Sequence, residues 1–274
     1  ALCLVAVSSP GWSLDLTATL AEGGLVTGRL PPGTAVTVTG GHAIVTDDGL
    51  LLLAVGRDVP EQIDVSIQFP SGLEQVEKVA VLQRQFKIQR INGLPSKQVT
   101  PPASVLERIR AEQVRVGRAR SQRRRQADFE TGFVWPVVGP ITGVYGSQRI
   151  LNGQPRQPHY GVDVGVPTGT VVAAPAAGLV TLAEDDLYFS GGTLIVDHGY
   201  GLSSSFLHLS EILVAEGERV TQGQAVAKVG ATGRVTGPHL DWRMNLGNVR
   251  IDPVLVLEAL APPTTSNPVE RRPY

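Results

Sequence analysis

The sequence predicts a mainly β protein, in which a small β-sandwich-like module and a helical connector precede a larger antiparallel β-sheet domain. The composition favours β structure, because 31 Gly and 20 Pro accompany only 18% charged residues among 274, a balance typical of turn-rich β folds. Apolar runs of strand length recur between turn residues along most of the chain. The chain length favours two modest cores over a single one.

Residues 1–13 have the composition of the end of an export signal. Residues 1–7 are almost entirely apolar, and Ser8, Ser9 and Pro10 follow them, as at the small-residue exit of a signal peptide. We therefore predict an exported protein, with a short buried strand as the alternative. Cys3 is the only cysteine, so no intrachain disulfide is predicted. No later run reaches the roughly 18 apolar residues that a membrane-spanning helix needs.

Residues 14–89 are predicted to form the small β-rich module. Apolar runs at 35–38 and 50–55 are separated by turn residues, which is the spacing of a small sandwich. His42, beside a Gly-Gly pair, is interpreted as a turn residue rather than a metal ligand. The module has no cluster of titratable groups, so we interpret it as a spacer, a docking module or a lid.

Residues 90–130 are predicted to be a linker followed by an arginine-rich helix. Ser104 and Glu107 have the spacing of a capping box, and helical composition runs from 103 to about 127 with eight arginines. A solvated helix face is one interpretation of this charge, and a docking site for an anionic polymer is the other. The net charge of the whole chain is −1, so general nucleic-acid binding is not expected.

Residues 131–260 are predicted to be the second domain, and residues 261–274 a disordered tail. Apolar runs punctuated by glycine, such as 179–182 and 193–196, are typical of a mostly antiparallel sheet. The last residues are rich in Pro, Thr, Ser and Arg, which is typical of a disordered terminus.

Four of the five histidines and two aspartates give this second domain the composition of a metal site. They are His159, Asp163, His198, His208, His239 and Asp241. Imidazole and carboxylate are usual ligands of a catalytic zinc ion, which takes three protein ligands. His239 and Asp241 would share one face of a strand, and Gly161 permits a bend that brings His159 and Asp163 together. Spacing alone leaves scattered surface histidines as an equal alternative.

An ordered series of motifs surrounds these positions. It includes Pro158-His159-Tyr160-Gly161-Val162-Asp163, Asp197-His198-Gly199, Leu207-His208-Leu209-Ser210, Gln222-Gly223-Gln224 and Gly237-Pro238-His239-Leu240. Over roughly residues 133–255 the series resembles the lysostaphin-like (LytM-type) zinc metalloendopeptidases, which hydrolyse bacterial peptidoglycan. The resemblance implies the lysostaphin-like peptidase fold and a location in the periplasm or cell envelope of a bacterium.

The resemblance also implies a role for five residues. His159 and Asp163 occupy the positions of two zinc ligands, and His208 and His239 occupy those of the catalytic pair. At the position of the third ligand, which is a histidine in the family, this chain has Asp241. Aspartate is itself a zinc ligand, so we predict a Zn²⁺ site formed by His159, Asp163 and Asp241.

The second carboxylate makes the predicted site formally neutral, rather than singly positive, once zinc is bound. We therefore expect a less acidic bound water and a relative preference for harder metals such as Mn(II). The alternative is that Asp241 marks a degenerate, non-catalytic domain.

Other residues near the motifs receive separate interpretations. His198 lies in a predicted hairpin turn and is interpreted as structural. Tyr160 is the main candidate for a substrate groove, and Tyr188 is a weaker one. Trp242 and Phe206 are interpreted as core or groove residues.

These observations predict an exported zinc metalloendopeptidase that cuts stem peptides or cross-links of peptidoglycan with a metal-activated water. His208 and His239 would accept the proton of the water and stabilise the oxyanion, in an order that the sequence does not assign. The alternative is a non-catalytic domain that binds cell wall or activates another wall hydrolase. A third interpretation, nucleic-acid binding through the arginine helix, rests on one charge run, and nucleic acid is not an expected partner.

Overall fold

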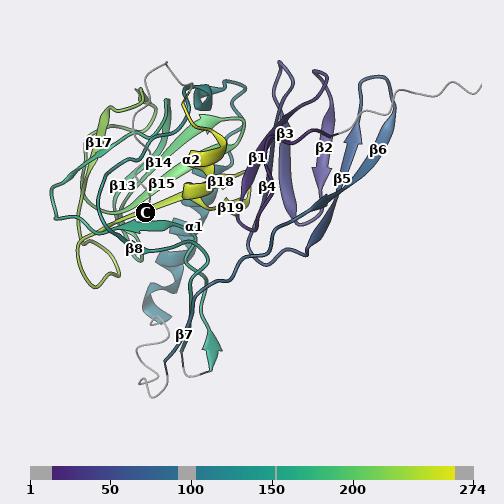
Figure 1. The fold of residues 1–274 in the computed structure, drawn as a ribbon. Coiled ribbons are helices and arrows are strands. Elements are labelled where there is room, and N and C mark those ends of the chain that lie inside the picture. Colours follow the sequence, from purple (N-terminus) through teal and green to yellow (C-terminus); the bar gives the residue numbers. More distant parts are fainter. Residues whose placement is uncertain (1–13, 92–102, 152, 263–274) are drawn as a thin grey trace, which may run out of the picture.

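The computed structural model describes residues 14–91, 103–151 and 153–262, and this part of the chain is mainly β. The predicted fold class is therefore confirmed. In Figure 1 a smaller group of purple and blue strands stands beside a larger green and yellow group, with helix α1 (Leu106–Arg120) next to the larger one. The predicted export signal at 1–13 and residues 263–274 of the predicted tail lie outside the described residues. Among the described residues, neither α-helix has the length and apolar character needed to cross a membrane.

The smaller group consists of two three-stranded antiparallel sheets, with strand orders β1-β4-β3 and β2-β5-β6. Its strands are β1 (Leu25–Arg29), β2 (Ala35–Val38), β3 (Gly41–Val45), β4 (Leu50–Val55), β5 (Gln62–Gln68) and β6 (Glu74–Ala80). Buried and exposed side chains alternate along β5, because only one face of its sheet meets the core. The arrangement agrees with the sandwich-like module that the sequence predicts.

Strand β4 connects the module to the larger domain, because its two faces belong to different cores. The core of the module contains Leu51, Leu53 and Val55, and the core of the larger domain contains Leu52 and Ala54. His42 lies at the same interface, where a Cβ added to Gly247 would approach its ring to 2.9 Å. The prediction that His42 is a turn residue was wrong, because the turn ends at Gly40 and His42 lies within β3.

The connector helix begins later than the sequence predicts. Ser104 lies in the short 3-10 turn η2 (Ala103–Val105), and α1 follows it directly. The N-cap is Val105, which makes no side-chain capping hydrogen bond. The predicted capping box of Ser104 and Glu107 was therefore wrong.

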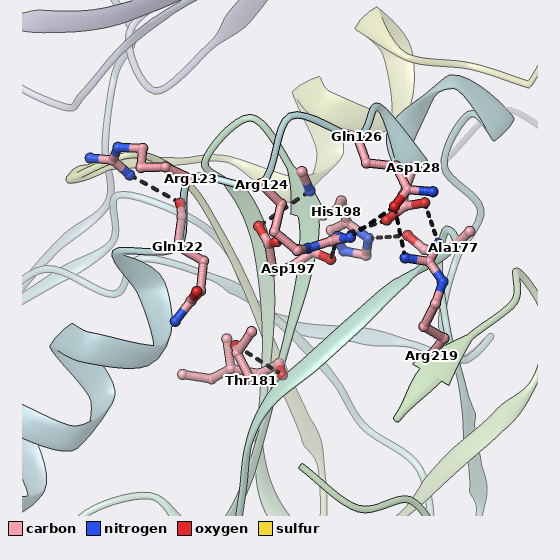
Figure 2. Close-up of polar contacts among 12 residues, drawn as sticks. Gln122, Arg123, Arg124, Gln126, Asp128, Ala177, Thr181, Asp197, His198 and Arg219 are labelled. Carbon is pink, nitrogen blue, oxygen red and sulfur yellow. Dashed lines mark hydrogen bonds and ion pairs between the residues drawn. The ribbon is translucent and has the colours of Figure 1, made fainter. Parts of the chain in front are cut away.

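The helix also ends earlier than predicted, at Arg120 rather than near residue 127. Arg124 donates to Asp197 at 2.6 Å and to Asp128 at 2.7 Å, and Arg219 donates to the other oxygen of Asp128 at 2.6 Å (Figure 2). These charge-assisted hydrogen bonds draw the chain onto the sheet and away from a helical path. A second 3-10 turn, η3 (Asp128–Thr131), then leads into the larger domain.

The larger domain is a ten-stranded antiparallel sheet with the central order β16-β13-β14-β15-β18-β11-β8, to which β12, β17 and β19 add at the sides. Its strands are β8 (Ile141–Gly143), β11 (Val162–Val164), β12 (Val171–Ala173), β13 (Gly178–Leu187), β14 (Gly191–Gly199), β15 (Leu202–Ile212), β16 (Arg219–Val220), β17 (Ala225–Val229), β18 (Leu240–Leu246) and β19 (Val249–Ile251). A separate small sheet joins β7 (Ile88–Ile91), β9 (Gln148–Leu151) and β10 (Gln154–Pro155).

The two faces of β18 have different surroundings. The apolar face is fully buried in the core and carries Leu240, Trp242, Met244 and Leu246. The polar face carries Asp241, Arg243 and Asn245, in register with Leu207, Ser205 and Ser203 of β15. The end of helix α1 lies over this polar face, because Arg120 donates to Ser205 Oγ at 3.1 Å.

Asp252 links the last helix, α2 (Pro253–Ala259), to the module. Its carboxylate caps α2 by accepting from Val254 N at 3.0 Å, and it accepts from Arg84 at 2.8 Å. We expect Asp252→Ala to lower the free energy of unfolding by about 2 kcal/mol, because it removes a cap and a largely buried ion pair. Asp252→Asn should lose less, because the amide oxygen can still cap the helix. Urea denaturation followed by tryptophan fluorescence measures both, and equal losses would contradict a contribution from the cap.

Candidate metal centre

Strands β11 and β18 place two carboxylates opposite each other. Asp163 pairs in register with Asp241, and in-register residues of antiparallel neighbours point to the same face of a sheet. His159 lies in the segment that leads into β11. One ligand atom from each of these three residues lies within 4.8 Å of the others. The structure thus brings together the three residues predicted as metal ligands.

Two atoms of this group are buried and make no hydrogen bond within the described part of the chain. They are His159 Nε2 and Asp163 Oδ1, which lie 3.2 Å apart. Buried polar atoms are rarely left unsatisfied, and these two atom types are common ligands of a divalent metal ion. The donor set therefore fits a metal ion at this position.

Two glycines leave room for the carboxylates. A Cβ at Gly143 of β8 would approach Asp163 Oδ2 to 2.1 Å, and a Cβ at Gly161 would approach Asp241 Oδ1 to 2.6 Å. Both distances are shorter than any real contact, so a larger residue would displace the carboxylates. The bend that the sequence predicts at Gly161 is confirmed, and the structure shows in addition that a residue without a Cβ is needed there for close approach.

The carboxylate of Asp241 forms an ion pair that the sequence analysis missed. Arg243 donates through Nε at 3.0 Å to Oδ1 and at 3.1 Å to Oδ2, and through Nη2 at 2.5 Å to Oδ2. Burial opposes ionisation of Asp241, but Arg243 outweighs it and holds the pKa of the carboxyl below its ordinary value. A carboxylate has about four lone-pair sites, so Asp241 can accept from Arg243 and still bind a cation.

Arg243 changes the charge predicted for the site. The expected neutral site included only the two carboxylates and the metal ion, and the guanidinium adds one positive charge beside them. The total then returns to the single positive charge of a site with one carboxylate and two histidines. The charge argument for a less acidic bound water is therefore removed, whereas the expected preference for Mn(II), which also depends on the two oxygen donors, stays a prediction. The signal was available, because Arg243 is two residues beyond Asp241 on a predicted strand and shares its face.

His208 and His239 lie beside the three candidate ligands. Their ring centroids are 5.0 Å apart. His208 Nε2 is 4.0 Å from Asp241 Oδ2, and His239 Nε2 is 3.8 Å from Asp163 Oδ1. Each Nδ1 lies 2.9 Å from a backbone carbonyl oxygen, that of Thr232 for His208 and of Gly237 for His239. An N–H at Nδ1 can donate there, which leaves Nε2 as a proton acceptor on the side of the carboxylates.

The backbone of His208 adopts an unusual conformation. Its φ of 66° is in the left-handed region, which few residues other than glycine occupy. The backbone N–H donates to the carbonyl of Ser190 at 2.8 Å, which helps to fix this conformation. Burial also lowers the pKa of the His208 ring, which favours its neutral form. Such local strain is typical of residues with a functional role.

The predicted groove aromatics fall into two groups. Trp242 and Phe206 are fully buried in the core and cannot line a groove. Tyr160 is half-buried and packs edge-on against Tyr145, with its ring centroid 4.5 Å from the guanidinium carbon of Arg250. Tyr188 packs against its neighbour Phe189 in the connection between β13 and β14. Tyr160, next to His159, remains the candidate for contact with substrate.

His198 is a buried residue of β14 and not part of a hairpin turn as predicted. Its Nδ1 lies 2.7 Å from the carbonyl oxygen of Ala177 (Figure 2). Its Nε2 lies 2.8 Å from Ser204 Oγ. Its ring packs edge-on against Phe133 at 5.0 Å. Both ring nitrogens are thus engaged within the fold, which agrees with the structural role predicted for it.

Burial lowers the pKa of His198 to about 4. The unfolded chain, with an ordinary histidine pKa, binds this proton first, so stability is full above pH 6.5 and falls as the pH drops towards 4. We expect the free energy of unfolding of chelator-treated protein to fall by roughly 2 to 3 kcal/mol over this window because of His198. In His198→Asn the pH dependence should be correspondingly shallower. Denaturant titrations at a series of pH values measure it, and an unchanged slope in the variant would contradict the assignment.

Four of the eight arginines in the run form ion pairs within the protein. Ion pairs join Arg108 to Glu112 and Asp186, Arg115 to Glu184, Arg124 to Asp128 and Asp197, and Arg125 to Asp47. These contacts attach the connector to β13, β14 and the module. They leave less free positive charge for an anionic polymer than the sequence suggests.

Comparison with known proteins gives relatives for the part of the chain that holds this centre. Residues 157–253 match the model of Peptidase family M23. Over 111 residues the chain is 39% identical to the peptidoglycan DD-endopeptidase ShyA of Vibrio cholerae, covering 40% of this chain and 25% of ShyA. Over 137 residues it is 36% identical to the peptidoglycan DD-endopeptidase ShyB of the same organism, covering 50% of this chain and 29% of ShyB. The matches thus span less than a third of each relative.

A solved structure resembles the chain over most of its length. It is a Pseudomonas aeruginosa protein assigned to peptidase M23, with 28% sequence identity and a TM-score of 0.67. The match covers 89% of this chain and 97% of that one. The likeness therefore extends beyond the larger domain to the module and the connector.

Proposed function

We propose that this chain, whose residues 157–253 belong to Peptidase family M23, is a zinc-dependent endopeptidase that hydrolyses stem peptides or cross-links of bacterial peptidoglycan. The observation that carries the proposal is the convergence of two unpartnered ligand atoms, on His159 and Asp163, with the Nε2 atoms of His208 and His239. The names of the relatives, peptidoglycan DD-endopeptidases, support the substrate class.

His159, Asp163 and Asp241 would hold the metal ion. When bound, a zinc ion supplies Lewis-acid polarisation of the scissile carbonyl and makes a water molecule more acidic. Arg243 keeps Asp241 ionised and oriented, which is the role of groups that hydrogen-bond to metal ligands. Its charge also makes an Asp241-containing site equivalent in total charge to one with a second histidine.

His208 and His239 would carry the proton transfer and the charge stabilisation. Each has an Nε2 free of hydrogen bonds to the described residues and directed to the carboxylate side of the centre. One ring accepts the proton of the attacking water through Nε2, and the other, when both of its nitrogens carry a proton, donates a hydrogen bond through Nε2 to the developing oxyanion. Tyr160 borders the same space and would contact the peptide backbone or side chains of the substrate.

The proposed substrate implies a location in the bacterial envelope. An exported location agrees with relatives named as peptidoglycan endopeptidases. Fractionation of the native host followed by immunoblotting tests this, and a cytosolic protein would contradict it.

A non-catalytic wall-binding or activating protein is the second candidate function. The observation in its favour is that Arg243 already satisfies both oxygens of Asp241. In such a protein the ion pair would replace the metal ion. His159 and Asp163 would then keep two buried atoms unsatisfied, which is costly, so the catalytic proposal accounts for more of the site.

The two candidates differ in the products that they leave. Purified, zinc-loaded protein is incubated with purified peptidoglycan, with and without a chelator, and the soluble fragments are identified by mass spectrometry. We expect chelator-sensitive conversion of cross-linked to uncross-linked fragments, and the fragment masses identify the bond. No conversion by folded, metal-loaded protein, across peptidoglycans of different cross-link type, would overturn the catalytic proposal.

A further inference from the structure

A cavity of about 390 Å³ lies between helix α1 and the larger domain. Its walls include Arg120 of α1, Gln157, Ser190 and Arg250 of β19. Two of the lining residues connect the cavity to the candidate metal centre. Gln157 is two residues before His159, and the carbonyl of Ser190 accepts the backbone N–H of His208. A group held in this cavity would therefore lie near the candidate metal centre.

The charge on the cavity walls is positive and unbalanced. Neither Arg120 nor Arg250 forms an ion pair with any carboxylate that the structure describes, and Arg120 Nε is buried without a hydrogen-bond partner. The acid on the wall, Glu112, is already engaged, because it accepts from Arg108 at 2.6 Å and from Tyr188 N at 2.9 Å. Two guanidinium groups thus remain without a counterion.

Both arginines are charged in an unfavourable environment. Burial, and then repulsion from Arg250 and Arg243, lowers the pKa of Arg120 to about 10. Burial and the repulsion of Arg243 likewise lower the pKa of Arg250. Each still carries a full positive charge at neutral pH. Charges that are desolvated without a partner are costly, so an anion in the cavity would remove a penalty that the free protein carries.

The guanidinium of Arg250 is held by its neighbours. The guanidinium carbon lies over the ring of Tyr160, 4.5 Å from the centroid. The backbone carbonyl of Arg250 accepts a hydrogen bond from the Tyr145 hydroxyl at 2.9 Å. Arg120 is anchored by its bond to Ser205. Guanidinium groups fixed in this way are suited to bidentate recognition of a carboxylate. Gln157 adds an amide at the same wall.

We propose that this cavity binds a free carboxylate of the peptide substrate, held by Arg120 and Arg250 next to the scissile bond. The inference rests on the proposed function and deepens it, since it selects peptides that carry a negative charge near the cleavage site. The volume suits one amino acid residue rather than a bare ion. Arg120 lies outside the residues that match Peptidase family M23, so the connector helix would contribute to the specificity of the domain.

The test compares two probes that differ only in this charge. They are diacetyl-L-lysyl-D-alanyl-D-alanine and its C-terminal carboxamide, titrated calorimetrically into the full chain depleted of metal, so that no turnover occurs. We expect the free acid to bind at least about tenfold more tightly than the amide, the strength of a charge-assisted pair. The difference should shrink at high salt. Equal affinities, or no detectable binding of the acid, would overturn the proposal.

Variants locate the effect. Arg120→Gln and Arg250→Gln should each bring the acid-to-amide affinity ratio close to one, whereas Arg118→Gln, on the exposed side of the same helix, should leave it unchanged. Arg120→Gln should also leave the melting temperature of the free protein unchanged or raise it, because it removes an uncompensated charge. A lower melting temperature together with an unchanged affinity ratio would make Arg120 a structural residue and sink the idea.

The outcomes separate this inference from the proposed function. If peptidoglycan is hydrolysed but both variants keep the preference for the acid, the cavity assignment fails and the endopeptidase stands. If the acid is preferred through both arginines but no peptidoglycan is cut, the endopeptidase fails and the carboxylate site stands.

Discussion

Alanine at His208 or His239 is expected to lower turnover of peptidoglycan about 10²- to 10⁴-fold while the metal ion stays bound. This is the usual contribution of a group that transfers a proton or stabilises charge in the transition state. Metal should stay because neither ring is among the three residues that cluster as ligands, His159, Asp163 and Asp241. Fragment release measured by mass spectrometry gives the rate, and elemental analysis of the same samples gives the metal content.

The matched comparison is His159→Ala. That variant should lose both metal and activity, because it removes an unpartnered ligand atom. Arg118→Ala, on an exposed face of α1, controls for the effects of preparing a variant and should behave as the parent. Normal turnover by His208→Ala or His239→Ala, or loss of metal from either, would contradict the division of roles between the two groups.

Removing the charge of Arg243 is expected to destabilise the metal-free protein far more than the zinc-loaded protein. Asp241 is 2% exposed, and Arg243 is its ion-pair partner. Loss of one partner of a buried pair leaves an uncompensated charge. We expect Arg243→Gln to lower the free energy of unfolding by about 2 to 3 kcal/mol without metal, at the low end for buried pairs because the Arg243 side chain is 27% exposed.

Zinc should restore much of this loss in Arg243→Gln, because the metal ion then provides the positive charge that Asp241 needs. Arg243→Lys, which keeps the charge but not the planar fork, should lose less without metal. Denaturation curves recorded with zinc and with chelator give the free energy of unfolding of the parent protein, Arg243→Gln and Arg243→Lys. The same loss in both conditions would show that Asp241 does not bind the metal ion.

The fold class could be predicted from local patterns in the sequence, whereas the grouping of the site residues was predicted from the resemblance that the ordered motifs carry, because spacing alone left scattered histidines as an equal alternative. Glycine-punctuated apolar runs gave the sheet, and the two-residue spacing of His239 and Asp241 follows strand geometry. The His159, Asp163 and Asp241 cluster is now seen in space. The helix boundaries were predicted less accurately. The end of α1 depends on the hydrogen bond from Arg124 to Asp197, a residue distant in sequence.

The two arginines that lie beside the site, Arg243 and Arg120, were not predicted from the sequence. Arg243 could have been found from its strand position beside Asp241, but Arg120 could not. Its place over the polar face of β18 results from the way the connector packs on the sheet, through contacts such as the bond to Ser205. No periodicity within residues 90–130 encodes that docking. Contacts between elements that are far apart in sequence could not be predicted from the sequence alone.

The segment that matches the family model, residues 157–253, depends for its structure on strand β8, which lies outside it. The recognised segment starts at residue 157, whereas β8 precedes it and pairs with β11, the strand of Asp163. Trp135, also upstream, packs its ring 5.8 Å from that of Trp242. A protein cut at residue 157 would expose β11 as an edge strand open to aggregation. The segment that matches the family model is thus smaller than the part of the chain that folds together, and mutations outside that segment can still remove a ligand from its place.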